Sequence, residues 1–256
     1  MKTLKFFLKL FSIAILIFLY LLSSFTTFLF VPARKRRKAL CFNCSYFVRK
    51  AIKILGLKIL VIKEFLPAEN KPYFIVSNHV SYTDILIISS FFPSSFVTST
   101  EVEKDIFLGT LAKAGGSLFV ERRKKTRLLK DLKQVTDVLL QNINVVVFPE
   151  GTSTNGEKIF PFKKTLFRAA INAKIPVLPL HIRYTSIDGQ LINEKNRDKI
   201  FWYGDMKFFP HFLSFLKLDS IHVNLKILQE IPCEFQSSDQ IAKIAYQVIS
   251  DAHQKI

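Results

Sequence analysis

Residues 73–88 read YFIVSNHVSYTDILII, and this stretch indicates the fold class most directly. Its first residues are aromatic and β-branched, a composition typical of a buried strand. Ser81 is followed three residues later by Asp84, which is the spacing of a capping box, so we expect a helix to begin at Ser81. A strand that passes through a short loop into a helix is the repeating unit of α/β folds.

The same alternation continues on both sides of this stretch. Residues 126–141 have the spacing of an amphipathic helix, and residues 238–253 predict a helix near the end of the sequence. Further short runs with strand composition occupy residues 59–62, 96–98, 117–120, 144–148, 177–184 and 222–228. The pattern therefore predicts an α/β domain over residues 57–256, with a mainly parallel sheet of about seven strands flanked by helices.

The N-terminal region has a different composition. Residues 10–33 carry no charge, and as a helix they would extend about 36 Å, enough to cross a bilayer. A cleaved signal peptide is the alternative, but the run is longer than the roughly 7 to 15 residues of a signal core. Five basic residues at 34–38 follow the run, which places the later domain on the cytoplasmic face of a membrane, as in a bacterial inner membrane.

Residues 39–56 predict a basic amphipathic helix that would lie on a membrane surface. Residues 1–56 are therefore expected to anchor the chain, either by one membrane-spanning helix or by a two-helix motif that enters one leaflet. Cys41 and Cys44 have C-x-x-C spacing, but no histidine or second cysteine pair lies nearby to complete a zinc site. They are interpreted as small apolar residues of the helix.

Composition limits the classes of function. Apolar residues make up 49% of the chain and charged residues 22%, which excludes an intrinsically disordered protein. The 37 Lys and Arg residues exceed the 20 Asp and Glu residues, so the formal charge of +17 favours an anionic partner. Three cysteines are too few for a disulfide-based scaffold.

The loop after residues 73–77 contains a candidate acid–base pair, His79 and Asp84. Residues five apart on a continuous helix point about 140° away from each other, so these side chains can meet only across a bend. The predicted cap at Ser81 supplies that bend. A carboxylate on one ring nitrogen fixes the tautomer of an imidazole and leaves the other nitrogen available as a base.

Two more segments place polar groups after predicted strands. Residues 145–154 read VVVFPEGTST, so Glu150 and backbone amides follow a buried strand. Residues 115–123 read GGSLFVERR, and the two arginines at the end of that strand are suited to bidentate recognition of a phosphate.

The chain resembles the glycerolipid acyltransferase family, the bacterial 1-acylglycerol-3-phosphate acyltransferases and their relatives, over about residues 57–230. The motifs that carry the resemblance occur in the family's order: Asn-His-x4-Asp, Gly-x-x-Phe-x-x-Arg, Phe-Pro-Glu-Gly-Thr and Ile-Pro-Val-Leu-Pro-Leu, which begin at positions 78, 116, 148 and 175. The resemblance implies that His79 is a catalytic base and Asp84 its orienting partner. It attributes the apolar strand at 175–180 to binding of the acyl donor.

The resemblance also implies a set of acceptor-binding residues, namely Gly116, Phe119, Arg122, Glu150, Gly151 and Thr152. One departure concerns Ser153 and Thr154, which stand where the family commonly has Arg-Ser, so one cation beside an acceptor phosphate is missing. Lys163 or Arg123 could replace the lost charge. This variant loop resembles branches of the family that act on lyso-ornithine lipid or other lysolipids, as do residues 161–163 (PFK) and residues 202–206 (WYGDM).

The function implied by the resemblance is that of a membrane-bound O-acyltransferase. Acyl-CoA or an acyl carrier protein would donate the acyl group to the hydroxyl of a lysophospholipid, and no further cofactor or metal ion is expected. We expect 1-acylglycerol-3-phosphate as the acceptor, giving phosphatidic acid, with lyso-ornithine lipid as the alternative.

Two other classes of function remain as alternatives. A non-catalytic, membrane-tethered protein could use the positive charge to bind anionic lipid or nucleic acid, but the sequence has no recognisable nucleic-acid motif and nucleic acid is not an expected partner. A hydrolase would need a nucleophile, and no Gly-x-Ser-x-Gly elbow is present. The remaining histidines stand singly in the sequence and are interpreted as packing or surface residues: His181, His211, His222 and His253.

Overall fold

A mixed β-sheet forms the centre of the computed structural model, which describes residues 2–121, 127–234 and 236–254. Within that part of the chain the sheet has eight strands in the order β1-β8-β6-β2-β5-β3-β4, and the short β7 pairs with β6. The strands are β1 (Leu57–Lys63), β2 (Phe74–Ser77), β3 (Ser94–Ser99), β4 (Leu118–Val120), β5 (Asn144–Val147), β6 (Val177–Ile187), β7 (Gln190–Leu191) and β8 (Ile221–Ile227).

Most neighbouring strands are parallel, as predicted. β2 pairs in parallel with both β5 and β6, and β3 pairs in parallel with β4 and β5. β8 is antiparallel to β6 but parallel to β1, so the sheet is mixed only at this side. Because the central strands are parallel, their carboxyl ends meet at one edge, and the loops that follow β2 and β5 become neighbours.

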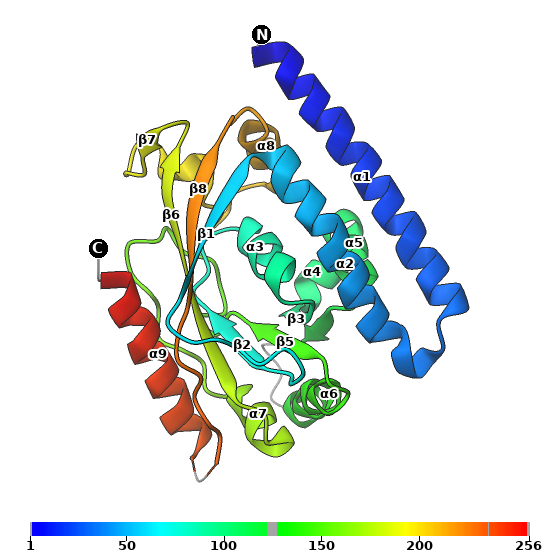
Figure 1. The fold of residues 1–256 in the computed structure, drawn as a ribbon, viewed down its shortest axis with the longest axis vertical. Helices are drawn as coiled ribbons and strands as arrows, with labels where there is room; N and C mark the ends of the chain where they lie inside the picture. The colour runs from blue at the N-terminus through cyan, green and yellow to red at the C-terminus, as the bar shows by residue number, and fades with distance from the viewer. Residues whose placement is uncertain (1, 122–126, 235, 255–256) are drawn as a thin grey trace.

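Helices cover both faces of the sheet (Figure 1). Successive side chains of β2 alternate between the two sides: Ile75 belongs to one buried cluster, and Phe74 and Val76 belong to the other. One face is covered by α2 (Ala33–Leu55), α3 (Thr83–Phe91) and α8 (Phe208–Phe215), and the other by α6 (Leu128–Leu140), α7 (Phe167–Ala173) and α9 (Ser238–Gln254). The predicted helices at 126–141 and 238–253 correspond to α6 and α9, and residue 126 lies outside the described residues.

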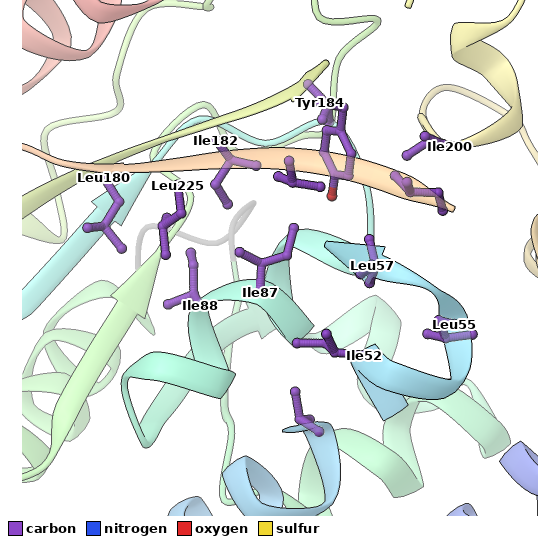
Figure 2. Close-up of a cluster of buried hydrophobic side chains, with 14 of the residues drawn as sticks. Ile52, Leu55, Leu57, Ile87, Ile88, Leu180, Ile182, Tyr184, Ile200 and Leu225 are labelled. Atoms are coloured by element: carbon purple, nitrogen blue, oxygen red, sulfur yellow. The ribbon is translucent and has the colours of Figure 1, made fainter. Parts of the chain in front are cut away.

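The first of these clusters also places one polar group of the candidate site. Figure 2 shows aliphatic side chains of α2, α3 and the sheet packed together, among them Ile52, Ile87 and Leu180. Tyr184 of β6 lies at one side of the cluster with its hydroxyl directed from the sheet toward α3. Its ring is 4% exposed, so the hydroxyl reaches α3 from within the core.

The N-terminal region forms a helical hairpin of α1 (Lys2–Phe30) and α2. Pro32 separates the two helices at a position where it can begin a helix but not continue one. Asn43 of α2 bonds to Ser23 and Ser24 of α1, with distances between the bonded atoms of 2.8 and 2.9 Å. The predicted helix at 39–56 is therefore too short: α2 begins at Ala33, and the basic residues 34–38 lie within its first turns.

Of the described helices, α1 is the one that is long and apolar enough to cross a membrane, over Thr3–Phe30. It lies alongside the domain and contacts it at several points along its length (Figure 1). The Tyr20 hydroxyl donates to the Leu111 carbonyl at 3.1 Å, and Lys5 lies 3.4 Å from the carboxylate of Asp219. The division of the chain at residue 56 into anchor and domain stays a prediction.

Shorter elements complete the fold: α4 (Thr100–Lys104), α5 (Ile106–Ala114) and η2 (Arg197–Lys199).

Candidate active site

His79 and Asp84 meet across the bend between β2 and α3. The distance from His79 Nδ1 to Asp84 Oδ2 is 2.9 Å, and the Asp84 side chain is fully buried. An ionised carboxylate only accepts hydrogen bonds, so Nδ1 carries the proton and Nε2 is the free acceptor of the ring. The imidazole is 16% exposed, so it is not sealed from the surface. The predicted contact is present, and the catalytic role of the pair stays a prediction.

Asp84 is held by several donors besides His79. Its Oδ2 accepts from the backbone amides of Val80 at 2.8 Å and Ser81 at 2.9 Å, and its Oδ1 accepts from the Tyr184 hydroxyl at 2.7 Å. Donors on both oxygens fix the plane of the carboxylate. The carboxylate in turn fixes the orientation of the imidazole.

The predicted start of the helix at Ser81 is wrong by two residues, because α3 begins at Thr83. The Ser81 hydroxyl donates to the Ile200 carbonyl at 2.8 Å rather than serving as the sole cap of the helix. Asp84 nevertheless reaches back to the Ser81 amide, which is the second half of a capping box. The bend that brings Asp84 to His79 therefore comes from the aspartate itself.

Asn78 fixes the other end of this loop. Its side-chain amide donates to the Ile182 carbonyl at 3.0 Å and accepts from the Ile182 amide at 2.9 Å. These bonds continue the pairing of β2 with β6 by one more residue, using side-chain atoms. His79 thus follows directly after a segment tied to the sheet.

The loop after β5 holds the backbone of His79 from the other side. The His79 amide donates to Glu150 Oε1 at 2.9 Å, and its carbonyl accepts from the Thr154 amide at 2.9 Å. The imidazole stacks on the Phe148 ring with centroids 3.9 Å apart and planes at 13°. Two loops that are distant in sequence therefore position one ring, as the parallel order of β2 and β5 predicts.

Glu150 is buried, at 4% exposure, and both of its oxygens accept from backbone amides. The second bond comes from the Phe160 amide at 2.8 Å. Burial raises the pKa of the Glu150 carboxyl to about 7, and these two bonds only partly oppose that rise. The contacts show that Glu150 shapes the loop, and its predicted contact with substrate stays a prediction.

Gly151 brings the backbone of this loop close to Lys163. Gly151 has φ +78°, and a Cβ atom there would lie 2.5 Å from Lys163 Nζ, so any side chain would displace the ammonium group. The Lys163 amide donates to the Pro149 carbonyl at 2.9 Å, which ties its backbone to the same loop. Lys163 and Thr152 are both exposed. A cation therefore lies beside the segment where the Ser153–Thr154 variation removes one.

The predicted phosphate-binding strand is only partly described. Gly116 has φ +75° and lies two residues before β4, where its carbonyl accepts from Ser95 Oγ at 2.6 Å and from Arg37 of α2. Phe119 lies within β4, and Lys113 Nζ is 5.7 Å from the centroid of its ring. Arg122 and Arg123 lie outside the described residues. Gly116 thus packs against α2, near the end of β4 that is opposite to Val120. The substrate contacts of Gly116, Phe119 and Arg122 stay predictions.

The fourth motif forms the start of β6. Val177, Leu178 and Leu180 are fully buried within the core. Phe74 and Ser77 of β2 pair with Val177 and Leu180. Burial in the core is enough to explain why these residues are apolar. The predicted role of the strand in binding the acyl donor stays a prediction.

Two contacts of the site, made by the Tyr184 hydroxyl and by the Trp202 amide, were not predicted from the sequence. Tyr184 holds Asp84, as described above. The Trp202 amide donates to the Val80 carbonyl at 2.8 Å, which joins the segment after η2 to the His79 loop. Tyr184 lies 100 residues beyond Asp84 and belongs to no motif that we identified, so no local pattern indicates this contact.

The other histidines and cysteines form no metal site among the described residues, where no group of three His, Cys, Asp or Glu side chains comes together. Two of the histidines that stand singly in the sequence meet in the fold: His181 Nε2 and His253 Nδ1 are 3.2 Å apart. Burial lowers the pKa of His181 to about 3, so this pair is uncharged at neutral pH. Cys41 is buried and its thiol contacts the Gly115 carbonyl, as a small packing residue would.

Known proteins share both the sequence pattern and the fold. Residues 58–183 match the family described as Acyltransferase. The chain is 31% identical over 183 residues to a lyso-ornithine lipid O-acyltransferase from Pseudomonas aeruginosa, covering 71% of this chain and 68% of that protein. The chain belongs to the PlsC-like glycerolipid acyltransferase family.

Relatives within this acyltransferase family carry names that differ in the acceptor. A lyso-ornithine lipid O-acyltransferase from Rhizobium meliloti is 33% identical over 69% of this chain and 62% of its own length. A 1-acyl-sn-glycerol-3-phosphate acyltransferase from Neisseria meningitidis is 32% identical over 58% of this chain and 61% of its own length. The acyltransferase activity and a lysolipid acceptor are therefore supported at the level of the family.

The crystal structure of the 1-acyl-sn-glycerophosphate acyltransferase PlsC from Thermotoga maritima shares the fold. It has a TM-score of 0.66 and 20% sequence identity, and the match covers 100% of this chain and 97% of that one. The match includes the helical hairpin as well as the α/β domain. The predicted fold class, with an apolar N-terminal helix before the sheet, is confirmed.

Proposed function

We propose that this acyltransferase moves an acyl group from a thioester, acyl-CoA or acyl carrier protein, to the free hydroxyl of a lysolipid at a membrane surface, with His79 as the general base. The observation that carries the proposal is the 2.9 Å bond between His79 Nδ1 and a buried Asp84, which leaves Nε2 as the ring's acceptor. Activation of an alcohol as a nucleophile requires a base with a free ring nitrogen, and His79, oriented by Asp84, provides one among the described side chains.

The reaction needs one proton carrier. His79 Nε2 takes the proton of the acceptor hydroxyl while that oxygen attacks the thioester carbonyl, forming a C–O bond. Collapse of the tetrahedral intermediate breaks the C–S bond, and the proton passes from the imidazolium to the departing thiolate. Asp84 holds the ring and stabilises the imidazolium between these two steps. Atoms and charges balance without an acyl-enzyme or a further cofactor.

Lyso-ornithine lipid is the acceptor that we propose first. Ser153 and Thr154 remove a cation that the family commonly has beside the acceptor phosphate. An ornithine head group presents one carboxylate beside an ammonium group and no phosphate, so it needs fewer cations than a phosphate does, and the exposed Lys163 would pair with the carboxylate. The similarity to relatives named lyso-ornithine lipid O-acyltransferases supports the same choice.

The second candidate acceptor is 1-acylglycerol-3-phosphate, supported by the relative from Neisseria meningitidis. Its phosphate would need a second cation, which Arg122 or Arg123 would supply. An acceptor panel of the two lysolipids, each with acyl-CoA and with acyl carrier protein as donor, tests the choice. A kcat/KM for 1-acylglycerol-3-phosphate above that for lyso-ornithine lipid would reverse our order.

The protein is proposed to bind one leaflet through the α1–α2 hairpin, with the active site on the cytoplasmic face. Contacts of Lys5 and Tyr20 with the domain hold α1 alongside it, so a helix crossing the bilayer would have to leave these contacts. The outward side of α1 is apolar and exposed. A lysolipid in the bilayer and a water-soluble thioester can both reach an active site at this boundary.

His79→Ala tests the base. Loss of general-base catalysis is expected to lower turnover by about 10² to 10⁴-fold with little change in folding. His222→Ala is the matched control, because His222 lies on β8 with its ring 2.9 Å from the Ser186 hydroxyl. The measurement is thioester-dependent acylation of a lysolipid by purified protein. DNA binding at physiological salt is assayed in parallel, because it tests the alternative of a non-catalytic nucleic-acid-binding protein. Turnover of His79→Ala equal to that of the control would refute the base assignment.

A further inference from the structure

A second apolar surface lies beside the hairpin, where α5 begins and α8 runs. We call it the α5–α8 surface and define it by Ile106, Phe107, Phe208, Phe209 and Leu213. The Phe107 ring lies 5.2 Å from the Phe209 ring and 5.9 Å from the Phe208 ring, measured between centroids, so the two helices form one surface. Ile106 is 90% exposed, Phe209 55% and Leu213 41%. Large apolar side chains so exposed and so close together indicate a partner.

Helix α8 is apolar on both of its sides. Phe212 and Phe215 face inward, with ring centroids 6.4 and 6.1 Å from the Tyr82 ring. Phe209 and Leu213 are four residues apart, so they share the outward side. Ser214 is the exposed polar residue of α8, and a helix whose outward side is otherwise apolar fits a protein core or lipid. Phe107 contacts Phe209 on this outward side, yet Phe209 and Leu213 remain 55% and 41% exposed, and lipid is the environment that fits them.

The α5–α8 surface adjoins α1 at two places. Tyr20 of α1 bonds to Leu111 of α5, and Lys9 of α1 bonds to the Leu218 carbonyl just after α8. The outward side of α1 carries exposed side chains seven residues apart, Leu4, Phe11, Phe18 and Phe25. Residues at that spacing share one side of a helix. Helix α1 therefore lies next to α5 and α8, and its exposed apolar side is turned away from the two bonds, because Tyr20 and Lys9 lie on the opposite side of the helix.

Basic residues flank the α5–α8 surface. Lys104 lies just before α5, Lys207 just before α8 and Lys217 just after it, and all three are exposed. Asp105 also lies here, but its carboxylate caps the first amides of α5. Aromatic side chains bordered by lysines are typical of the boundary between lipid head groups and acyl chains. The pattern fits a membrane with anionic lipids better than a second protein.

We propose that the α5–α8 surface is a second membrane contact, which enters the same leaflet as α1 and holds the His79 loop at the bilayer surface. The inference rests on the proposed membrane location of the enzyme. Trp202 links the two features: its ring lies 6.3 Å from the Phe208 ring, and its amide bonds to Val80, the residue after His79. A lysolipid would then reach His79 sideways from the leaflet, without leaving it.

Trp202 is the single tryptophan of the chain, so it reports on this region alone. The probe is a set of vesicles of phosphatidylcholine and phosphatidylglycerol, with and without bromine atoms on the acyl chains near the head group. Bromine quenches indole fluorescence at short range. We expect brominated vesicles to quench Trp202 in the full-length protein, and equal fluorescence in both kinds of vesicle would overturn the proposal.

The double variant Ile106→Ser, Phe209→Ser tests the surface itself, and Leu129→Ser is the matched control because Leu129 is 80% exposed on α6, over the other face of the sheet. The double variant should lose most of the quenching and acylate a vesicle-embedded lysolipid about tenfold more slowly, since two large apolar side chains no longer enter lipid. It should acylate a short-chain, water-soluble lysolipid as the wild type does. Unchanged quenching in the double variant would overturn the proposal.

Two further outcomes separate this inference from the proposed function. If Trp202 is quenched but no variant or wild-type protein acylates any lysolipid, the proposed function fails and the membrane contact stands. If the detergent-solubilised wild type is a dimer that the double variant dissociates, the surface joins two copies of the chain, and the membrane contact is refuted.

Discussion

The two sides of the candidate site are built differently. On one side Asp84 is fully buried, and both of its oxygens accept hydrogen bonds from His79, the backbone and Tyr184. On the other side Lys163 is exposed and lies across Gly151 with an unbranched, flexible side chain. The first arrangement suits the proposed base, which would act in the same way on every acceptor hydroxyl. The second leaves the charge at the proposed head-group site adjustable, which suits a family whose members carry the names of different acceptors.

Asp84→Asn should give the largest effect. A neutral amide cannot stabilise the imidazolium, and its nitrogen would face donors that now bond to a carboxylate oxygen. We expect kcat to fall by about 10² to 10⁴-fold while the KM values of both substrates change little.

Asp137→Asn is the matched control, because Asp137 is an exposed acid on α6 that pairs with Lys133. Melting temperatures of both variants separate orientation from folding. If Asp84→Asn lowers only the melting temperature and leaves kcat intact, then Asp84 has a structural role alone.

Glu150→Gln should change the pH dependence of stability. Burial raises the pKa of Glu150 in the folded protein to about 7, above its ordinary value of 4.5, so folding favours the protonated carboxyl. Its contribution to the free energy of unfolding is therefore greatest below pH 4.5 and falls by roughly 3 kcal/mol as the pH rises to 7. Glutamine does not titrate, so the variant lacks this fall.

Melting temperatures of wild type and variant across this pH range test the prediction. Glu194→Gln is the control, since Glu194 is exposed. A difference between wild type and Glu150→Gln that stays constant with pH would show that folding does not raise the pKa of Glu150.

The sequence predicted the rigid side of the site better than the adjustable side. The strands before His79 and Glu150 are short apolar runs that alternate with helical segments, so the sequence alone predicts them. Parallel pairing of β2 with β5 makes the loops after these strands neighbours. His79 and Asp84 are five residues apart, so a local bend decides their contact. The start of α3 was misplaced because Ser81 bonds to Ile200, and a contact over that sequence distance has no local signal.

Long-range contacts also explain what the sequence did not show. Tyr184 reaches Asp84 only because β6 pairs beside β2, a strand order that the alternation of helices and strands leaves open. Lys163 was one of two candidates for the missing cation, and its position across Gly151 depends on the left-handed backbone of that glycine. Helix α2 was predicted too short because its basic first turns have no apolar stripe to indicate a helix.

Tyr184→Phe should have a moderate effect on the buried side. The variant removes one donor to Asp84 Oδ1 without changing the shape of the core. Loss of a hydrogen bond to a buried charge is expected to cost about 2 kcal/mol of unfolding free energy, while turnover falls less than in Asp84→Asn because Oδ2 still holds His79. Chemical denaturation and kcat measure the two effects. A loss of turnover equal to that of Asp84→Asn would show that Tyr184, rather than the carboxylate alone, sets the orientation of the ring.

Lys163→Ala should give the smallest effect and the one that depends on the acceptor. Exposed charge pairs contribute about 0 to 1 kcal/mol, so we expect the KM of the acceptor to rise by no more than about fivefold, with kcat and the KM of the thioester unchanged. Lys164→Ala is the matched control, because Lys164 is also exposed but pairs with Asp239 at 2.6 Å. Since the interaction is screened by salt, the difference between the two variants should shrink as ionic strength rises. An unchanged acceptor KM in Lys163→Ala at low salt would remove Lys163 from the head-group site and leave Arg122 and Arg123 as the cations to test next.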